Sequence, residues 1–253
     1  MLCDVLIEKQ FIYVLNYYSI MITENSQLKI TIASIETLGA LDGPGLRTII
    51  FFKGCPLRCK YCHNADMLSF NGGENWTIDD LVTKCIKYKN FYGSDGGVTL
   101  SGGEPLAQPA AAVALIKALQ KNGIHVALDT SGYPFNEDVL SAVDLVLLDI
   151  KHTDPQCFLE LVGVPIDNTL KTLVYIKKID KPFWIRQVIV KGITDSKEQV
   201  LKLKELAEGS EKIELLAYHK LGINKWKNLG LKYPLESVPA TSAETIERLN
   251  KLL

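Results

Sequence analysis

Residues 55–62 read Cys-Pro-Leu-Arg-Cys-Lys-Tyr-Cys and directly follow an apolar run at residues 48–52. The three cysteines, Cys55, Cys59 and Cys62, lie too close in sequence for disulfides to satisfy all three thiols. Three thiolates can instead ligate three irons of a cubane iron–sulfur cluster and leave the fourth iron without a protein ligand. An iron with an open position is reactive, so this spacing indicates a chemical site rather than a structural cross-link.

A zinc site or a group of buried thiols is the alternative explanation for these cysteines. Zinc needs a fourth ligand nearby, usually from a second pair of cysteines or histidines. His63 is adjacent to Cys62, but neighbouring ligand directions make a four-ligand site from this loop alone difficult. A non-catalytic module that holds an iron–sulfur cluster or zinc therefore stays open beside the enzyme.

The composition limits the class of protein. The chain has 253 residues, 47% hydrophobic and 23% charged, with a net charge of −1. This is globular composition without a global basic field for nucleic acid. The chain has six cysteines, and the three outside the motif show no paired spacing, which favours a reduced, cytoplasmic protein. The apolar run at residues 11–22 is too short to span a membrane and lacks signal-peptide flanks, so no membrane association is expected.

The N-terminus predicts a boundary. We expect residues 1–20 to be an extension outside the fold, and Met21 is a candidate for the physiological start of translation. Residues 21–253 are predicted to be a single domain, because no linker, internal repeat or low-complexity tract divides them.

Beyond about residue 46, short β-rich runs alternate with helical segments. Strands are expected at residues 48–52, 97–100, 124–129, 145–150, 183–190 and 213–217, and helices at 77–89, 109–122, 136–142, 167–178, 195–208 and 242–253. Runs rich in Val, Ile and Leu are typical of parallel strands covered on both faces. Six strand–helix units fall short of the eight in a closed barrel. The predicted fold is therefore α/β, a partial, open (β/α)6 barrel of the TIM-like kind.

Residues with chemical functions gather around the ends of the predicted strands, where function collects in parallel α/β folds. They are Ser101-Gly102-Gly103-Glu104-Pro105, Asp129-Thr130, Asp149-Ile150-Lys151 and Tyr218-His219, with Arg186 inside the fifth strand. Buried charges need partners, so these groups either form an ion-pair network or contact a charged ligand. Asp129 and Asp149 can alternatively share a small cation. The turn at residues 41–47 either merely begins the barrel or directs Asp42 toward a substrate entrance.

Together these motifs resemble the glycyl-radical-enzyme activases of the radical S-adenosylmethionine (SAM) superfamily. The resemblance rests on the three-cysteine motif, with Tyr61 before its last cysteine, and on segments 42–47, 62–64, 101–105, 148–151, 184–186 and 216–219. It runs from about residue 30 to the C-terminus and implies the radical SAM core fold. Residues 1–20 have no counterpart in the family pattern.

The resemblance implies an oxidoreductase that cleaves SAM reductively at a [4Fe–4S] cluster. The products are methionine and a 5′-deoxyadenosyl radical, which takes a hydrogen from a glycine of a partner enzyme. The resemblance implies that the cluster is held by Cys55, Cys59 and Cys62, which act in catalysis together with Lys151. It implies that SAM is bound by Tyr61, Cys62, His63, Gly102, Gly103, Glu104, Asp149, Ile150, Lys151 and His219. It also implies a monovalent cation at Asp129, Thr130 and Asp149, and contacts of Asp42 and Arg186 with the protein substrate.

The resemblance also implies the partners. Only Cys85 lies between Cys62 and Ser101, so the ferredoxin-like insert of many other activases is missing. The later strand–helix units, which the shorter activase of anaerobic ribonucleotide reductase lacks, are present. This combination favours pyruvate formate-lyase, in anaerobic metabolism, as the protein substrate, with a relative such as ketobutyrate formate-lyase as the alternative. Flavodoxin or ferredoxin is the expected electron donor, and the chain is expected to be a monomer that binds neither nucleic acid nor membranes.

Overall fold

The computed structural model describes residues 28–253, and the hypotheses on residues 1–20 and Met21 lie outside this range. The elements in chain order are β1 (Lys29–Gly39), β2 (Arg47–Phe52), η1 (Ala65–Met67), β3 (Glu74–Thr77), α2 (Ile78–Ile86), α3 (Lys89–Tyr92), β4 (Gly97–Gly102), η2 (Pro105–Ala107), α4 (Pro109–Lys121), β5 (Val126–Thr130), α5 (Glu137–Ala142), β6 (Leu145–Asp149), α6 (Pro155–Val162), α7 (Asp167–Lys178), β7 (Phe183–Ile189), α8 (Lys197–Leu206), β8 (Lys212–Ala217), α9 (Ile223–Asn228) and α10 (Ala243–Asn250).

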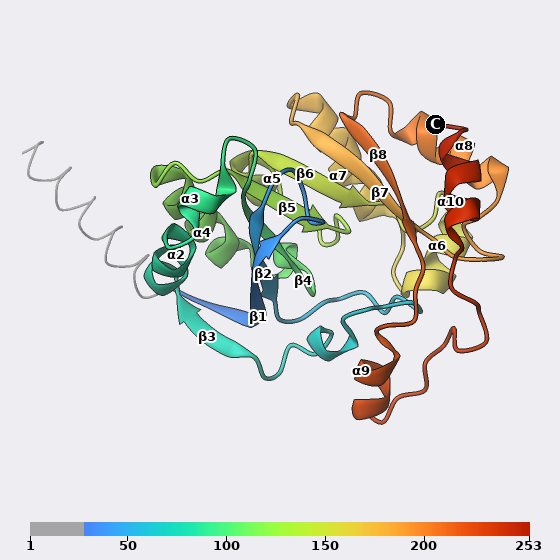
Figure 1. The fold of residues 1–253 in the computed structure, drawn as a ribbon, viewed down its shortest axis with the longest axis horizontal. Helices are drawn as coiled ribbons and strands as arrows, with labels where there is room; N and C mark the ends of the chain where they lie inside the picture. Colours follow the sequence, from blue (N-terminus) through green and yellow to red (C-terminus); the bar gives the residue numbers. More distant parts are fainter. Residues whose placement is uncertain (1–27) are drawn as a thin grey trace, which may run out of the picture.

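One eight-stranded sheet runs through the described residues in the order β3-β1-β2-β4-β5-β6-β7-β8 (Figure 1). Strands β2 and β4 to β8 pair in parallel, whereas β1 is antiparallel to β2 and β3 is antiparallel to β1. Within residues 28–253 no pairing joins β3 to β8. The sheet is therefore an open, partial barrel, as predicted.

The six predicted parallel strands are confirmed, but β1 and β3 are additional. In β1, Ile30 and Ile32 are buried, and the residues that follow are half-exposed or exposed. Such a pattern is typical of an antiparallel strand with one solvated face. The prediction relied on continuous apolar runs, which mark strands buried on both faces, and therefore could not find it.

The predicted helices are confirmed in position, with one correction to the first. Thr77 caps α2, since its hydroxyl accepts a hydrogen bond from the backbone N–H of Asp80 at 3.1 Å. A single helix was expected to continue to residue 89, but α2 ends at Ile86 and the short α3 follows separately. Gly123 follows α4 with φ of +65°, the left-handed conformation that commonly ends a helix. The short helices α6 and α9 were not predicted.

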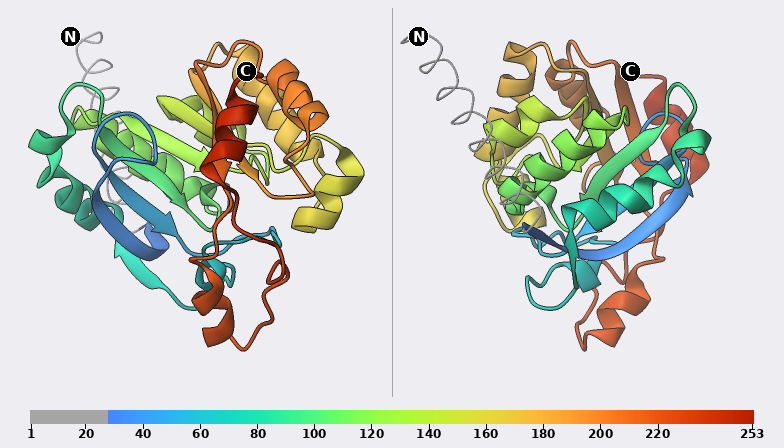
Figure 2. Two further views of the ribbon diagram at one scale, coloured as in Figure 1. Left: turned by 45° about the vertical axis from the view of Figure 1, so that its right-hand side comes forward. Right: turned by 90° about the vertical axis from the view of Figure 1, so that its left-hand side faces the viewer.

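The sheet separates a large apolar core from a polar interior. Buried side chains of its strands pack against α2, α4, α5, α7, α8 and α10, and Figure 2 shows the helices outside the curved sheet. Cys85 of α2 is buried in this core. Successive side chains of a strand point to opposite faces, so Val126 and Leu128 face the helices while Asp129 lines the inner cavity. The same alternation brings polar residues of other strands to the inner face.

Candidate active site

A cavity of about 710 Å³ lies on the inner side of the barrel, within the size range of small-molecule sites. It extends from the cysteine loop after β2 to Trp184 and Lys212, at the amino ends of β7 and β8. Its lining includes fifteen of the predicted site residues: Asp42, Cys55, Cys59, Tyr61, Cys62, His63, Gly102, Gly103, Glu104, Asp129, Thr130, Asp149, Lys151, Arg186 and His219. Ile150 differs, because its side chain is fully buried in the outer core; any contact of Ile150 with a ligand would have to come from its backbone.

The cysteine loop is fixed on both sides by backbone hydrogen bonds. The N–H of Cys55 donates to the carbonyl of Leu68 at 3.2 Å, and the N–H of Arg58 donates to the carbonyl of Val162, at the end of α6, at 2.7 Å. The guanidinium of Arg58 also donates to the carbonyl of Cys55 at 2.7 Å. These protein contacts therefore fix the backbone of the cysteine loop, and the loop conformation does not depend on its thiols.

The three thiols are in a largely apolar environment. Cys55 and Cys59 are buried and Cys62 is half-buried. Burial is the main cause that raises the pKa of all three thiols, that of Cys59 to about 12. A bare thiolate is therefore unfavourable here, and a bound metal would take the place of the proton.

The spacing of the thiols tests which metal group they fit. Within residues 28–253 the only three potential ligands whose atoms all lie within 4.8 Å of one another are His152, Asp154 and Cys157; the trio of Cys55, Cys59 and Cys62 is therefore wider. Tetrahedral zinc, with Zn–S bonds of about 2.3 Å, would bring thiolates to about 3.8 Å from each other. The wider spacing fits a polynuclear cluster better than a single zinc ion.

The compact group around His152 is a helix cap. The Nδ1 atom of His152 accepts the N–H of Asp154 at 2.9 Å, and Nε2 lies 3.2 Å from the carbonyl oxygen of Ile193. The carboxylate of Asp154 in turn accepts the N–H of Cys157 at 2.9 Å and caps α6. Both ring nitrogens are occupied, so this group is not built for a metal.

The segment around α9 closes over the cysteine loop. The indole Nε1 of Trp226 donates to the carbonyl of Cys62 at 2.8 Å, and Lys225 donates to the side chain of Asn64 at 2.9 Å. Figure 1 shows α9 beside η1 and away from the other helices. The rings of His63 and His219 meet edge to face with centroids 4.5 Å apart. Residues separated by more than 150 positions are thereby joined at one edge of the cavity.

The glycine loop after β4 packs directly against the end of β2. A Cβ atom on Gly102 would lie 2.4 Å from the nitrogen of Phe52, and one on Gly103 would lie 2.2 Å from the carbonyl oxygen of Gly54. The N–H groups of Gly103 and Glu104 donate to the carbonyls of Phe52 and Gly54 at 2.8 and 2.9 Å. These glycines therefore allow the two loops to touch, and these two N–H groups serve the protein itself rather than a ligand.

Glu104 is the organising carboxylate of that loop. It is 2% exposed and accepts the hydroxyls of Thr130 and Ser131, both at 2.6 Å, and the N–H groups of Ser131 and Leu106 at 3.0 and 3.2 Å. Burial raises its pKa to about 7, against the opposing effect of these hydrogen bonds. Glu104 thus ties the ends of β4 and β5 together.

A network of alternating charges crosses the inner face. Asp149, Arg186 and Glu214 are register partners on β6, β7 and β8. Arg186 contacts Asp129 at 3.2 Å and Glu214 at 3.4 Å, and Lys151 contacts Asp149 at 2.5 Å. The pairing confirms an ion-pair network. A bound monovalent cation at Asp129, Thr130 and Asp149 stays a prediction.

Asp42 enters the cavity from the loop between β1 and β2. Burial, and next the carboxylate of Asp129, raise the pKa of Asp42 to about 6, while Arg186 opposes the shift. Asp42 and Arg186 are thus brought into one electrostatic environment within the cavity lining.

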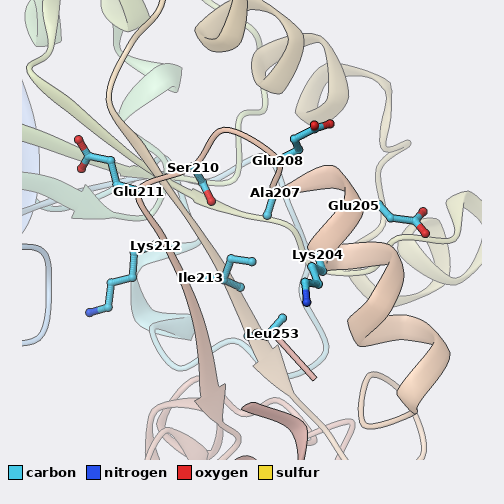
Figure 3. A pocket seen from close by; sticks show the side chains of 9 residues that line it. All are labelled: Lys204, Glu205, Ala207, Glu208, Ser210, Glu211, Lys212, Ile213 and Leu253. Atoms are coloured by element: carbon cyan, nitrogen blue, oxygen red, sulfur yellow. The ribbon is translucent and has the colours of Figure 1, made fainter. Parts of the chain in front are cut away.

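A second cavity of about 710 Å³ is open and lies outside the barrel, between the end of α8, the start of β8 and Leu253. Figure 3 shows the carboxyl groups of Glu205, Glu208 and Glu211 pointing apart from one another. The amine of Lys204 is engaged by the carbonyl of Leu252 at 3.0 Å. No convergent polar set is present in this cavity, so the inner cavity is the candidate active site.

The fold and the inner cavity define a radical SAM enzyme, and residues 49–203 match the family described as the Radical SAM superfamily. The chain is 44% identical over 231 residues to a pyruvate formate-lyase-activating enzyme of Clostridium pasteurianum, covering 88% of this chain and 96% of the relative. It is 42% identical over 234 residues to the enzyme of the same name from Staphylococcus epidermidis, covering 87% and 93%. The chain belongs to the radical SAM superfamily and, within it, to the family of pyruvate formate-lyase-activating enzymes. Membership implies a [4Fe–4S] cluster and SAM as cofactors.

Solved structures agree with this fold. A domain of a pyruvate-formate lyase-activating enzyme from Bacteroides vulgatus superimposes with a TM-score of 0.52 at 25% identity, covering 62% of this chain and 92% of that one. Streptococcus suis SuiB bound to S-adenosylmethionine gives 0.62 at 19% identity, covering 80% and 47%. The second likeness concerns the fold alone. No helix in residues 28–253 is both long and apolar enough to cross a membrane.

Sequence reasoning missed several residues of the site. Trp226 closes the cysteine loop, Ser131 holds Glu104, and Trp184, Lys212 and Glu214 line the far end of the cavity. Glu214 had a usable signal, since a charged residue stands within an otherwise apolar strand. Trp226 gave none, because its partner is a backbone carbonyl remote in sequence.

Proposed function

We propose that this chain activates pyruvate formate-lyase by generating a glycyl radical on it. The observation that carries the proposal is the single cavity that joins the three-cysteine loop to Asp42 and Arg186. A SAM site and an entrance for a polypeptide segment can thereby share one space. Curated relatives at 41–44% identity carry the name of this activity. Ketobutyrate formate-lyase is the alternative partner.

Cys55, Cys59 and Cys62 would hold the [4Fe–4S] cluster. When bound, the cluster and SAM supply the reductive cleavage that gives methionine and a 5′-deoxyadenosyl radical. The protein's task is to orient and shield these groups, and the inner side of the barrel suits it. The free position left by three cysteines matches the need of SAM for an iron site.

Polar atoms without partners support the placement of SAM. The hydroxyl of Tyr61 and the Oδ1 atom of Asp149 are buried in the cavity wall and make no hydrogen bond within the described chain. Buried polar atoms are normally satisfied, so these two await a ligand group. Lys151 lies 5.9 Å from the centre of the Tyr61 ring and is neutralised by Asp149, which keeps its ammonium in place beside the cofactor.

The remaining predicted residues complete the SAM site. Gly102, Gly103 and Glu104 form the part of the wall that packs beside the cysteine loop, and His63 and His219 meet at another part of the lining. Asp129, Thr130 and Asp149 would ligate a monovalent cation, which would share the two carboxylates with Arg186 and Lys151.

Asp42 and Arg186 suit a glycine-bearing segment of the partner. A carboxylate accepts a backbone N–H, and a guanidinium donates to a backbone carbonyl. Both groups line the same cavity as the three cysteines. A glycine of the partner held by them would therefore share one cavity with SAM.

The proposal includes the setting of the reaction. We propose that the enzyme works in a reducing cytoplasm, since all five cysteines in the described part of the chain are free. Flavodoxin or ferredoxin would be the one-electron donor. The enzyme would be a monomer formed by one radical SAM domain. Electron transfer needs a shallow acceptor, and Cys62 at the edge of the cavity is half-buried rather than buried.

Anaerobic incubation with SAM, a reductant and either pyruvate formate-lyase or ketobutyrate formate-lyase tests this assignment. Electron paramagnetic resonance should detect a glycyl radical on pyruvate formate-lyase, and the Cys59→Ala variant should give none. A radical on ketobutyrate formate-lyase alone would move the assignment to the alternative partner. About one zinc per chain and no SAM cleavage would support the non-catalytic module instead.

A further inference from the structure

Arg47 is a buried cation that the proposed chemistry does not use. It begins β2, is 0% exposed, and forms no ion pair with a carboxylate anywhere in residues 28–253. A buried charge without a counter-ion is costly unless hydrogen bonds compensate for it. Its environment therefore shows what the guanidinium is built to hold.

Neutral acceptors surround the guanidinium on every side. Nε donates to the hydroxyl of Thr99 at 2.7 Å, and Nη1 donates to the carbonyls of Pro44 and Asp95 at 3.0 and 3.3 Å. Nη2 donates to the carbonyls of Val98 and His125 at 2.8 and 3.4 Å and lies 3.1 Å from Nδ1 of His125. A lysine has only three donors and no planar fork, so it could not hold this set.

These contacts converge on the loop that carries Asp42. The Nη1 atom of Arg47 binds the carbonyl of Pro44 directly. Thr99 accepts from Arg47 and donates its own hydroxyl proton to the carbonyl of Asp42 at 2.6 Å. One side chain therefore holds two carbonyls of the loop, one on each side of Gly43.

Gly43 explains why such an anchor is needed. Its φ of +120° is a conformation that residues with side chains rarely adopt, and a Cβ atom there would lie 3.1 Å from Cδ of Arg47. The glycine gives the loop of residues 42–44 conformational freedom, and the loop packs closely on the side chain of Arg47. Beyond it, Leu41 is 83% exposed, so few other contacts restrain this tip.

We propose that Arg47 is a positioning residue for the protein substrate: by fixing the backbone of residues 42–44 on β4, it holds the Asp42 side chain in the cavity lining. The inference rests on the proposed function of Asp42 at the partner's glycine segment. Neither Arg47 nor Thr99 lines the cavity itself, and both reach it only through the loop of residues 42–44. Their effect should therefore be confined to the partner and should not extend to SAM.

The test compares Arg47→Lys and Thr99→Val in the anaerobically reconstituted full chain. Thr99→Val keeps the shape of the side chain and removes only the relay to the Asp42 carbonyl. The matched control is Thr48→Val, which removes a buried hydroxyl from the neighbouring strand β2, where Thr48 accepts from Tyr92. Iron content and the Kd for SAM report on the rest of the site.

Both variants should raise the KM for a glycine-bearing partner peptide by about tenfold, with kcat, iron content and the Kd for SAM within about twofold of the wild type. Thr48→Val should leave the KM unchanged. Amide hydrogen exchange of residues 40–46 should accelerate in both variants and not in the control. An unchanged KM, or a KM and a Kd for SAM that rise together, would overturn the assignment.

The exchange measurement separates this inference from the proposed function. If the wild-type chain forms no glycyl radical on any partner, the proposed function fails, and the substrate role of Arg47 fails with it. If radical formation occurs but residues 40–46 exchange equally slowly in wild type and variants, the positioning role of Arg47 alone is refuted.

Discussion

Replacing Glu104 by Gln should change how the stability of the chain depends on pH. The folded-state pKa of Glu104 is raised from 4.5 to about 7, so the folded chain holds this proton more tightly than the unfolded chain does. Such a group contributes stability below pH 4.5 and loses that contribution as pH rises through about 7. A shift of this size corresponds to about 3 kcal/mol, of which about 2.5 kcal/mol is lost between pH 5 and 8.

Urea unfolding of the metal-free chain, followed by circular dichroism at pH 5 and pH 8, measures this effect. The free energy of unfolding of the wild type should fall by about 2.5 kcal/mol more than that of Glu104→Gln over this interval. Glu208→Gln is the matched control, because Glu208 is exposed and lines the separate outer cavity, and it should follow the wild type. Parallel curves for the wild type and Glu104→Gln would refute the reasoning.

Three further changes test other parts of the site. Cys59→Ala should abolish formation of 5′-deoxyadenosine while leaving the circular dichroism spectrum intact; full production by this variant would remove Cys59 from the cluster. Asp42→Asn should bind SAM normally but raise the KM for the partner peptide. In the wild type this KM should rise as pH falls through about 6, because the carboxylate of Asp42, with a pKa of about 6, then takes up a proton. A KM that does not change with pH would contradict the role of Asp42. Trp226→Phe keeps the ring and loses the bond to the Cys62 carbonyl, so urea unfolding should show a loss of about 1 to 3 kcal/mol; no loss would mean that the carbonyl finds another donor.

The sequence carried enough information for the parallel part of the fold. Residues 145–148 of β6, for example, form a continuous apolar run, and such runs predict burial on both faces. β1 lies at the edge of that set, where a polar face is tolerated, and its pattern did not distinguish a strand from a loop. The position of a strand at the edge depends on the whole sheet and cannot be predicted from the residues of that strand alone.

The candidate site shows the same division between local and remote information. Cys55, Cys59 and Cys62 are neighbours in sequence, so their spacing alone indicated a metal site. The contact between Trp226 and Cys62 joins residues 164 positions apart through a backbone carbonyl, which any residue provides. Arg47 was visible as part of a turn motif, but its burial depends on β4 and on the loop that precedes β4.

Transfer of a label from the partner's glycine tests the central claim most directly. Pyruvate formate-lyase carrying glycine deuterated at Cα would be incubated anaerobically with the chain, SAM and a reductant, and the 5′-deoxyadenosine would be examined by mass spectrometry. Abstraction of hydrogen from glycine predicts deuterium in 5′-deoxyadenosine, in proportion to the glycyl radical formed. Unlabelled 5′-deoxyadenosine, produced at the same rate with or without the partner, would contradict the account.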